Sequence, residues 1–161
     1  MNTVHTLQEY VVALRDAGIL TGCTVPEALL GRGVECLTYD TRTLRENALF
    51  ICKGAHFKEE YLRDALSHGA FAYVAEQQHD VDAPCILVSD IRYSLVVLGQ
   101  LFYDHVTDKL TSIGITGTKG KSTTAYYVRY ILNDWLRAQD RNECAILSSI
   151  DNYDGVITEE S

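Results

Sequence analysis

The residues best suited to chemistry lie in a glycine-rich segment, residues 114–123, which ends in Gly-Lys-Ser-Thr. Gly120 would let the backbone approach a phosphate, and a helix beginning nearby would offer free N–H groups and the positive end of its dipole. Lys121 would supply a positive charge to the β- and γ-phosphates, and the Ser122 hydroxyl could ligate Mg²⁺. The segment therefore predicts a loop that binds the phosphates of a nucleotide.

This loop is shorter than the common pattern G-x-x-x-x-G-K-[ST]. That pattern requires glycine at position 115, where the chain has Ile115, and the glycine lies at Gly117 instead. A chance Gly-Lys-Ser in an ordinary surface loop is the alternative. The placement of the segment between a strand-like run and a helical run favours the phosphate-binding interpretation.

Three runs of residues must position the loop. Residues 110–116 and 144–149 are strand-like, and residues 121–138 have the pattern of a helix. Strand, glycine loop, helix and strand predict a βαβ unit, with a parallel sheet and a right-handed crossover. Parallel strands need cover on both faces, which about fifty residues cannot supply. We therefore expect exposed apolar surface in this part, with self-association or disorder as its outcome.

The chain before this unit predicts a separate domain. The capping-box sequence from Thr6 to Glu9 predicts a helix that ends near Gly18. Apolar patterns predict further strands and helices over residues 34–39, 48–53, 59–68, 70–75, 85–88 and 91–103. A polar link follows, so we expect a boundary near residue 105 and domains at 1–105 and 106–161. The fold class is α/β, a mixed-sheet domain followed by the first βαβ unit of a P-loop-type parallel-sheet domain.

Composition and charge exclude several classes of protein. The 161 residues carry a net charge of −8, which argues against nucleic acid or an anionic membrane as a partner. No run of about 18 uncharged apolar residues is present, so we expect no membrane-spanning segment. The five scattered cysteines include no C-x-x-C pair, which predicts reduced thiols in a cytoplasmic protein. Four of them lie in apolar runs and are expected in the core, namely Cys36, Cys52, Cys85 and Cys144.

Residues 117–123, Gly-Thr-Lys-Gly-Lys-Ser-Thr, resemble the ATP-binding loop of the Mur ligase superfamily, which usually reads Gly-Thr-Asn-Gly-Lys-Thr/Ser. Folylpolyglutamate and cyanophycin synthetases share this loop, so it does not choose among ATP-dependent amide ligases. The resemblance implies ATP and Mg²⁺ as cofactors, Lys121 as a catalytic residue and Ser122 as a metal ligand. It implies ATP contacts from Gly117, Thr118, Lys119, Gly120, Lys121, Ser122 and Thr123.

The first part of the chain indicates which of these ligases it resembles. Residues 37–42, Leu-Thr-Tyr-Asp-Thr-Arg, and 48–54, Ala-Leu-Phe-Ile-Cys-Lys-Gly, are similar to the UDP-binding domain of UDP-N-acetylmuramoyl-tripeptide synthetases, the MurE type. The similarity extends over about residues 34–155. Thr41 replaces the usual serine and keeps a hydroxyl that can donate and accept a hydrogen bond. The implied contacts to the UDP part of the substrate are Tyr39, Thr41, Ala55, His56 and Phe57.

This resemblance implies a ligase that adds lysine or diaminopimelate to the D-Glu carboxylate of UDP-MurNAc-L-Ala-D-Glu in peptidoglycan precursor synthesis. ATP would convert the carboxylate into an acyl phosphate, which the incoming amine attacks. The family's carbamylated lysine, second Mg²⁺ site and amino-acid pocket lie later in the sequence than residue 161. We therefore expect an N-terminal part that is inactive alone and has the UDP-MurNAc-dipeptide as its partner.

Two other interpretations stay open. A different P-loop enzyme, such as a small kinase, would need an acidic Mg²⁺ residue after a later strand, for which Asp151 and Asp154 are weak candidates. A non-enzymatic UDP-sugar-binding module could keep the loop without using it. Among single residues, 40–42 could form a simple turn, His56 could be a surface histidine and Phe57 could serve packing alone.

Overall fold

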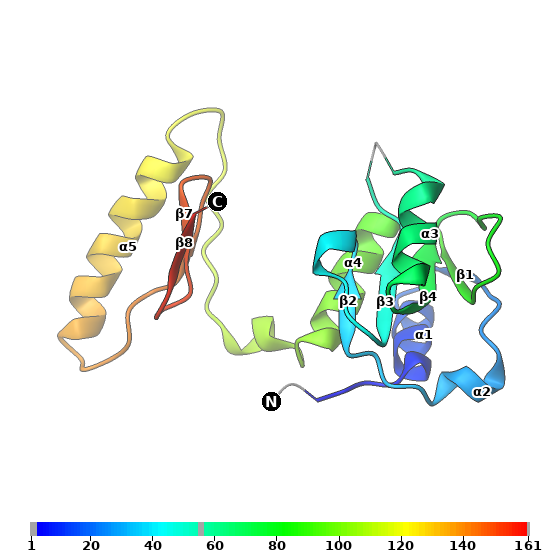
Figure 1. Ribbon diagram of the computed structural model, residues 1–161. Coiled ribbons are helices and arrows are strands. Elements are labelled where there is room, and N and C mark those ends of the chain that lie inside the picture. The colour runs from blue at the N-terminus through cyan, green and yellow to red at the C-terminus, as the bar shows by residue number, and fades with distance from the viewer. Residues whose placement is uncertain (1–2, 55–56, 161) are drawn as a thin grey trace. The chain divides into compact units, whose positions relative to one another are not determined.

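The computed structural model describes residues 3–54 and 57–160. The chain separates into two compact units, Met1–Thr111 and Ser112–Ser161, each with its own sheet (Figure 1). In the described ranges, no helix is long and apolar enough to cross a bilayer.

The first unit is built on a five-stranded mixed sheet with the order β1-β5-β4-β3-β2. The bounds are β1 Leu20–Cys23, β2 Cys36–Thr38, β3 Ala48–Ile51, β4 Ala70–Ala75 and β5 Cys85–Val88. Strands β2 to β5 run parallel, and β1 pairs antiparallel with β5. The four parallel strands lie inside the runs predicted at residues 34–39, 48–53, 70–75 and 85–88. The α/β class with a mixed sheet is therefore confirmed.

Helices cover both faces of this sheet, as buried parallel strands require. The helices are α1 Leu7–Asp16, α2 Glu27–Leu30, α3 Glu59–Ser67 and α4 Ile91–Phe102, with 3-10 turns η1 Thr41–Thr43 and η2 Val106–Lys109. α1 and α4 pack on the face that carries Leu49 and Ile51 of β3. α3 packs on the opposite face, which carries Phe50 and Cys52. The alternation along β3 thus separates two apolar cores.

Local sequence signals set the ends of two helices. The Thr6 N–H donates to the Glu9 carboxylate at 2.7 Å, so the predicted capping box is present. Gly18 follows α1 at φ 72°, a left-handed conformation that glycine adopts without strain. α4 begins after Asp90, whose Oδ1 accepts two backbone N–H groups of the first helical turn, each at 2.9 Å.

The sequence pattern missed β1 and α2, which have four residues each. β1 depends on a distant partner, because Leu20 pairs with Val88 of β5. A Cβ at Gly22 would lie 3.2 Å from the Leu87 side chain, so glycine permits this close pairing. α2 contains no buried residue and therefore has no apolar periodicity to detect.

The second unit consists of one helix and an antiparallel sheet. α5 spans Lys121–Arg137, which confirms the helix predicted at residues 121–138. Strands β6 Ile146–Leu147, β7 Asp151–Tyr153 and β8 Thr158–Glu160 pair in chain order, each antiparallel to the next. Residues 111–117 form no strand. The prediction of a strand at residues 110–116 and of a parallel βαβ unit is therefore wrong for this structure.

The physical reason for this difference lies in the demands of parallel pairing. A parallel strand needs a neighbour that arrives through a crossover, and it needs apolar cover on both faces. Antiparallel strands joined by short turns pair with residues close in sequence, as β6, β7 and β8 do. In this short unit, strands therefore pair with neighbours close in sequence and not with a strand that arrives through a crossover helix.

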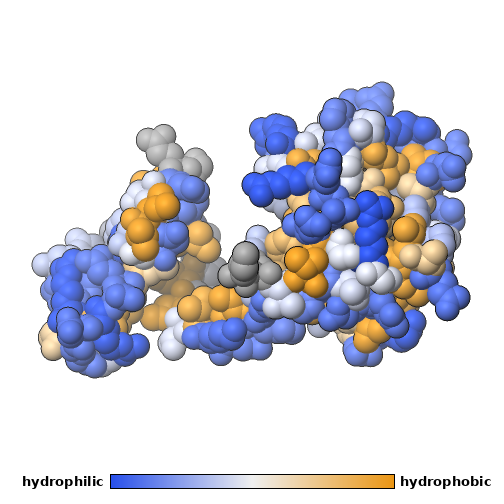
Figure 2. Space-filling view, turned by 60° about the horizontal axis from the view of Figure 1, so that its bottom comes forward, coloured by the Kyte–Doolittle hydropathy of each residue, from blue (hydrophilic) through white to orange (hydrophobic). Residues whose placement is uncertain are grey.

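α5 leaves much of its apolar face exposed. Four large side chains of the helix are between 54% and 68% exposed, namely Tyr127, Tyr130, Ile131 and Trp135. The buried residue of α5 is polar: Asn133 accepts a hydrogen bond from the Cys144 N–H at 2.8 Å. Figure 2 shows strongly hydrophobic residues, in orange, at several places on the surface of the chain. The prediction of exposed apolar surface in this part is confirmed.

All five cysteines are free thiols. Cys36, Cys52 and Cys85 are buried as predicted, whereas Cys144 is half-buried and Cys23 is exposed. Burial raises the pKa of the Cys52 thiol to about 12. This thiol is therefore protonated at neutral pH and acts as a small packing residue.

Candidate functional site

The first candidate site lies at the carboxyl ends of two neighbouring parallel strands. Tyr39 and Thr41 follow β2, and Lys53 follows β3. β2 and β3 pair in register, with Thr38 opposite Phe50, so both segments leave the sheet at the same edge. Ligands of open α/β sheets bind outside this edge. The fold thus brings the residues predicted in the first UDP-contacting stretch beside a lysine from the next strand.

Hydrogen bonds fix the turn that carries Tyr39 and Thr41. The Thr38 and Thr43 hydroxyls lie 2.7 Å apart, and the Asp40 N–H donates to Thr38 Oγ1 at 3.0 Å. Asp40 also caps the short helix η1. Thr41 is half-buried, and within the described ranges its hydroxyl makes no hydrogen bond. Residues 40–42 can therefore form a turn and also take part in a site, because no hydrogen bond within the described ranges occupies the Thr41 hydroxyl.

The Asp40 and Arg42 side chains neutralise each other at this turn. Arg42 Nη2 lies 2.6 Å from Asp40 Oδ2, and Arg42 Nε lies 3.0 Å from Asp40 Oδ1. These hydrogen bonds, with the Arg42 backbone N–H, hold the pKa of Asp40 at about 2. Arg42 extends into solvent, with 87% of its side chain exposed. The guanidinium is thus already paired with a carboxylate.

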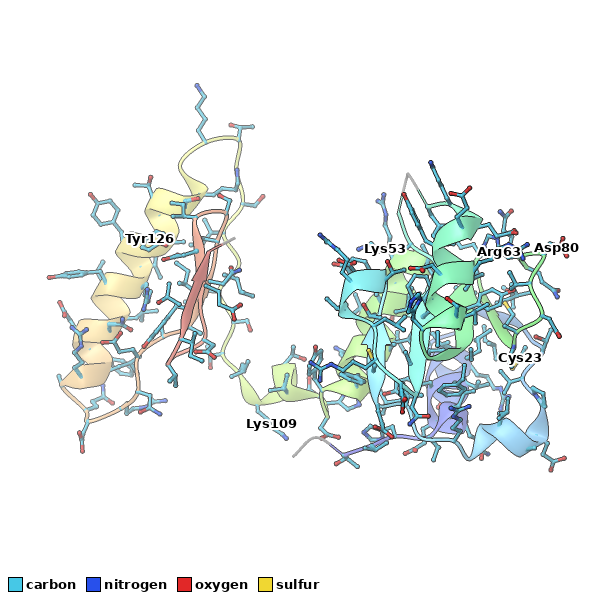
Figure 3. The ribbon with its side chains drawn as sticks, viewed as in Figure 1. Cys23, Lys53, Arg63, Asp80, Lys109 and Tyr126 are labelled. Atoms are coloured by element: carbon cyan, nitrogen blue, oxygen red, sulfur yellow. The ribbon has the colours of Figure 1, made fainter. Side chains whose placement is uncertain are left out.

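Lys53 was not among the residues predicted to contact substrate. Its Nζ lies 4.7 Å from the centre of the Tyr39 ring, a cation–π contact across the two strand ends. Lys53 projects from the segment after β3 (Figure 3). The signal in the sequence was the Lys-Gly pair directly after a buried strand, but only the parallel pairing shows that it meets Tyr39.

Phe57, predicted in the second UDP-contacting stretch, lies in a packed aromatic group. Its ring centre is 5.3 Å from that of His79 and 6.5 Å from that of Tyr61. Arg63 of α3 donates to the Asp80 carbonyl at 2.5 Å, which holds the β4–β5 loop beside this group (Figure 3). Packing accounts for Phe57 in this structure, and its contact with UDP stays a prediction. The neighbouring predicted contacts, Ala55 and His56, lie outside the described residues.

The second candidate site is the glycine-rich loop before α5. Gly120 has φ 76° and directly precedes the helix, so the loop turns into α5 through a conformation suited to glycine. The Thr124 N–H donates to the Gly120 carbonyl at 2.9 Å and starts the helical hydrogen bonds. The N–H groups of residues 121–123 precede that bond and point toward the loop without helical partners. This arrangement suits an anion such as a phosphate.

Lys121 and Ser122, predicted as catalytic residue and metal ligand, adjoin this loop. Lys121 Nζ donates to the Gly117 carbonyl at 2.9 Å, so the ammonium lies over its own loop. The Ser122 and Ser149 hydroxyls lie 3.4 Å apart. The other predicted ATP contacts, Thr118, Lys119 and Thr123, are exposed around the same turn.

The loop residues fit the phosphates of a nucleotide. The free helical N–H groups and the Lys121 ammonium supply hydrogen-bond donors and positive charge in one place. In the described part of the chain, no group of three or more His, Cys, Asp or Glu side chains could hold a metal ion. The Ser122 hydroxyl could be one ligand of a Mg²⁺ bound with the nucleotide.

The fold of the chain is found in solved Mur ligases. It aligns with MurF from Acinetobacter baumannii at a TM-score of 0.59 and 21% identity, over 83% of this chain and 28% of that chain. It aligns with a UDP-N-acetylmuramoyl-L-alanyl-D-glutamate–2,6-diaminopimelate ligase at a TM-score of 0.61 and 18% identity, over 94% and 29%. These likenesses define the class of the fold as that of a Mur ligase.

Sequence comparison gives the type within this class, although no protein-family model matches the chain. The chain is 41% identical over 130 residues to the UDP-N-acetylmuramoyl-L-alanyl-D-glutamate–L-lysine ligase of Enterococcus faecalis, covering 80% of this chain and 25% of that protein. It is 37% identical over 158 residues to the UDP-N-acetylmuramyl-tripeptide synthetase of Lactobacillus delbrueckii subsp. bulgaricus, covering 97% and 30%. The chain belongs to the Mur ligase family as a homologue of its MurE-type members, and it spans 25–30% of the length of these relatives.

Proposed function

We propose that this chain is part of an ATP-dependent ligase that adds lysine or diaminopimelate to the D-Glu carboxylate of UDP-MurNAc-L-Ala-D-Glu. The observation that carries this proposal is the match to a tripeptide synthetase over 97% of the chain, which includes both candidate sites. The first unit supplies a strand edge suited to a nucleotide, and the second supplies a phosphate loop. Peptidoglycan precursor synthesis is the process in which this reaction belongs.

The two candidate sites have different roles in the proposed reaction. The domain at residues 1–105 would hold the UDP moiety through Tyr39, Thr41 and the stretch at residues 55–57. The segment at residues 106–161 would begin the ATP-binding domain. Binding both substrates to one enzyme is the positional contribution that an enzyme makes to a transfer reaction.

The phosphate loop would lower the barrier to phosphoryl transfer by electrostatics. ATP supplies the phosphoryl group that converts the D-Glu carboxylate into an acyl phosphate, which the amine of the amino acid attacks with loss of phosphate. During this transfer Lys121 and the N–H groups of residues 121–123 would stabilise the negative charge on the phosphate oxygens. Ser122 would hold the Mg²⁺ that neutralises the remaining charge.

Substrate binding tests the proposal directly. We expect calorimetric titration of the 161-residue chain with UDP-MurNAc-L-Ala-D-Glu to show binding at one site. Thr41→Ala should weaken this binding about three- to tenfold, because a single hydrogen bond from the free hydroxyl is lost. Thr107→Ala, at an exposed threonine of η2, is the matched control and should leave the affinity unchanged.

The outcomes of this titration separate the alternatives. Absence of binding by the wild-type chain would refute the assignment of the first unit. Tight Mg-ATP binding followed by phosphoryl transfer, without affinity for the UDP-dipeptide, would favour a kinase instead. Phosphate release that depends on both ATP and an amino acid would show that the chain ligates by itself, which we do not expect.

A further inference from the structure

We propose that Lys53 binds the pyrophosphate of the uridine nucleotide, with its ammonium held in place by the Tyr39 ring. The juxtaposition that carries this inference is the 4.7 Å contact between the Lys53 Nζ and the centre of the Tyr39 ring at the carboxyl edge of β2 and β3. The inference rests on the proposed function and adds to the site a residue that the sequence prediction did not include.

The distribution of charge at this edge singles out Lys53. Arg42 directs its Nε and Nη2 donors to Asp40, so much of its charge is neutralised by that carboxylate. Lys53, in contrast, forms no ion pair within the described ranges, although the whole chain has a net charge of −8. Lys53 is a half-buried residue, and within the described ranges its ammonium is not neutralised by a carboxylate and can bind an anionic ligand. In an acidic chain, such a cation marks a place where an anion is bound.

The Tyr39 ring explains how this ammonium is positioned. A flexible lysine side chain loses freedom of rotation about several bonds when it binds a ligand, and this entropic cost weakens the ion contact. The electron-rich face of an aromatic ring attracts the ammonium without cancelling its charge, as a carboxylate would. The ring is itself 57% exposed, so the cation it holds lies at the surface of the site. Tyr39 is therefore a positioning residue in this proposal, and Lys53 is the binding residue.

The backbone after β3 directs Lys53 toward this edge. The Lys53 N–H donates to the Ile51 carbonyl at 2.9 Å, a tight turn at the end of the strand. Gly54 follows with φ 122°, a conformation that favours glycine, so the chain changes direction directly after the lysine. The Lys-Gly pair thus has a geometric reason: the glycine turns the backbone away, and the lysine stays at the strand end.

Comparing UDP with uridine distinguishes a role of Lys53 in binding phosphate from a role in maintaining the fold. The probes are UDP and uridine, and the measurement is NMR titration of the 161-residue chain, which detects weak binding. We expect Lys53→Met to weaken UDP binding about ten- to a hundredfold, the effect of losing a charge-assisted hydrogen bond. Uridine affinity should stay the same, because uridine carries no phosphate. Unchanged uridine binding also shows that the variant is folded.

Three further variants sharpen this test. Lys53→Arg should restore most of the UDP affinity, since the charge is kept. Tyr39→Leu should weaken UDP binding, because the ring that positions the ammonium is lost. Lys58→Met is the matched control, since Lys58 is exposed and has no aromatic contact in the described part of the chain. This control should leave UDP binding unchanged.

The inference and the proposed function fail in different ways. If the wild-type chain binds neither UDP nor the UDP-MurNAc-dipeptide, the proposed function fails and this inference falls with it. If the wild type binds UDP and Lys53→Met binds it equally well, the inference is overturned while the proposed function stands. Equal losses of UDP and uridine affinity in Lys53→Met would also overturn it, because they would show a general structural role.

Discussion

His5 lies between two carboxylates, one four residues along the chain and the other 99 residues away. Its Nδ1 is 3.1 Å from Glu9 Oε1, and its Nε2 is 2.8 Å from Asp104 Oδ1. The Thr3 N–H donates to the same Asp104 carboxylate at 3.1 Å. These contacts tie the segment before α1 to the turn after α4, where Asp104 has φ 52°. At the scale of single residues, the protonation of His5, Glu9 and Asp104 therefore makes the free energy of unfolding depend on pH.

The pKa shifts set the pH range in which this group stabilises the fold. Hydrogen bonds with Asp104 and Glu9 raise the pKa of His5 above its ordinary 6.5. The His5 contribution is therefore complete below pH 6.5 and is lost as the pH rises through the raised value. The Thr6 backbone N–H and hydroxyl, with His5, lower the pKa of Glu9 from 4.5 to about 2. That contribution is present above pH 4.5 and is lost as the pH falls toward 2.

We expect His5→Gln to remove the loss of stability that deprotonation of His5 causes at alkaline pH. Wild-type stability should fall between about pH 5.5 and about pH 9, and the fall should be smaller in His5→Gln because no imidazolium is lost. The urea midpoint of unfolding at the two pH values is the measurement. His105→Gln is the control, since the exposed His105 lies 3.9 Å from Asp108. An equal fall in wild type and His5→Gln would contradict the assignment.

At the scale of elements, the end of β5 and the start of α4 depend on one cap. The Asp90 carboxylate accepts the N–H groups of Arg92 and Tyr93, and these donors would otherwise have no helical partner. α4 then buries Ile91 and Leu98 against the sheet. Asp90 therefore helps to fix the start of α4, together with Glu76, whose carboxylate accepts the Ile91 N–H at 3.0 Å.

We expect Asp90→Ala to lower the free energy of unfolding by about 1 kcal/mol, the usual cost of losing an N-cap. Asp90→Asn should retain most of this stability, because its side-chain oxygen still accepts the N–H groups. Urea unfolding followed by circular dichroism measures both. Asp82→Ala, at an exposed position of the β4–β5 loop, should have no effect. A cost for Asp82→Ala equal to that for Asp90→Ala would argue against a capping role.

At the scale of the whole molecule, the two units differ in how much they bury. The first unit has apolar cores on both faces of its sheet. In the second unit, the buried residues among those described are Asn133 and Ile146. Stability within a chain follows buried contacts, so the units should open independently and with different free energies.

Hydrogen exchange should separate the two units. Amides of β3 and β4 should exchange about a thousandfold more slowly than those of α5, because β3 and β4 open only when the first unit unfolds. We also expect concentration-dependent association in light scattering, with Trp135→Gln reducing it and Tyr93→Gln leaving it unchanged. A monomer at all concentrations, with α5 as protected as β3, would contradict both expectations.

Several parts of this protein follow from local chemistry and can be predicted from the sequence alone. Apolar runs of strand length placed the four parallel strands, and the Thr6–Glu9 capping box placed the start of α1. The Gly-Lys-Ser loop was found because its function depends on residue types that are adjacent in the chain. In each case the physical cause acts over a few residues, so a pattern in the sequence is enough to reveal it.

Features that depend on residues distant in sequence are visible only in the folded chain. β1 exists because β5 pairs with it, and residues 111–117 form no strand because no parallel neighbour reaches them. His5 meets Asp104 across 99 residues of sequence. Lys53 meets Tyr39 because β2 and β3 pair in one register, and a different register would separate them. Such contacts depend on how the strands and helices pack, which a single sequence does not display.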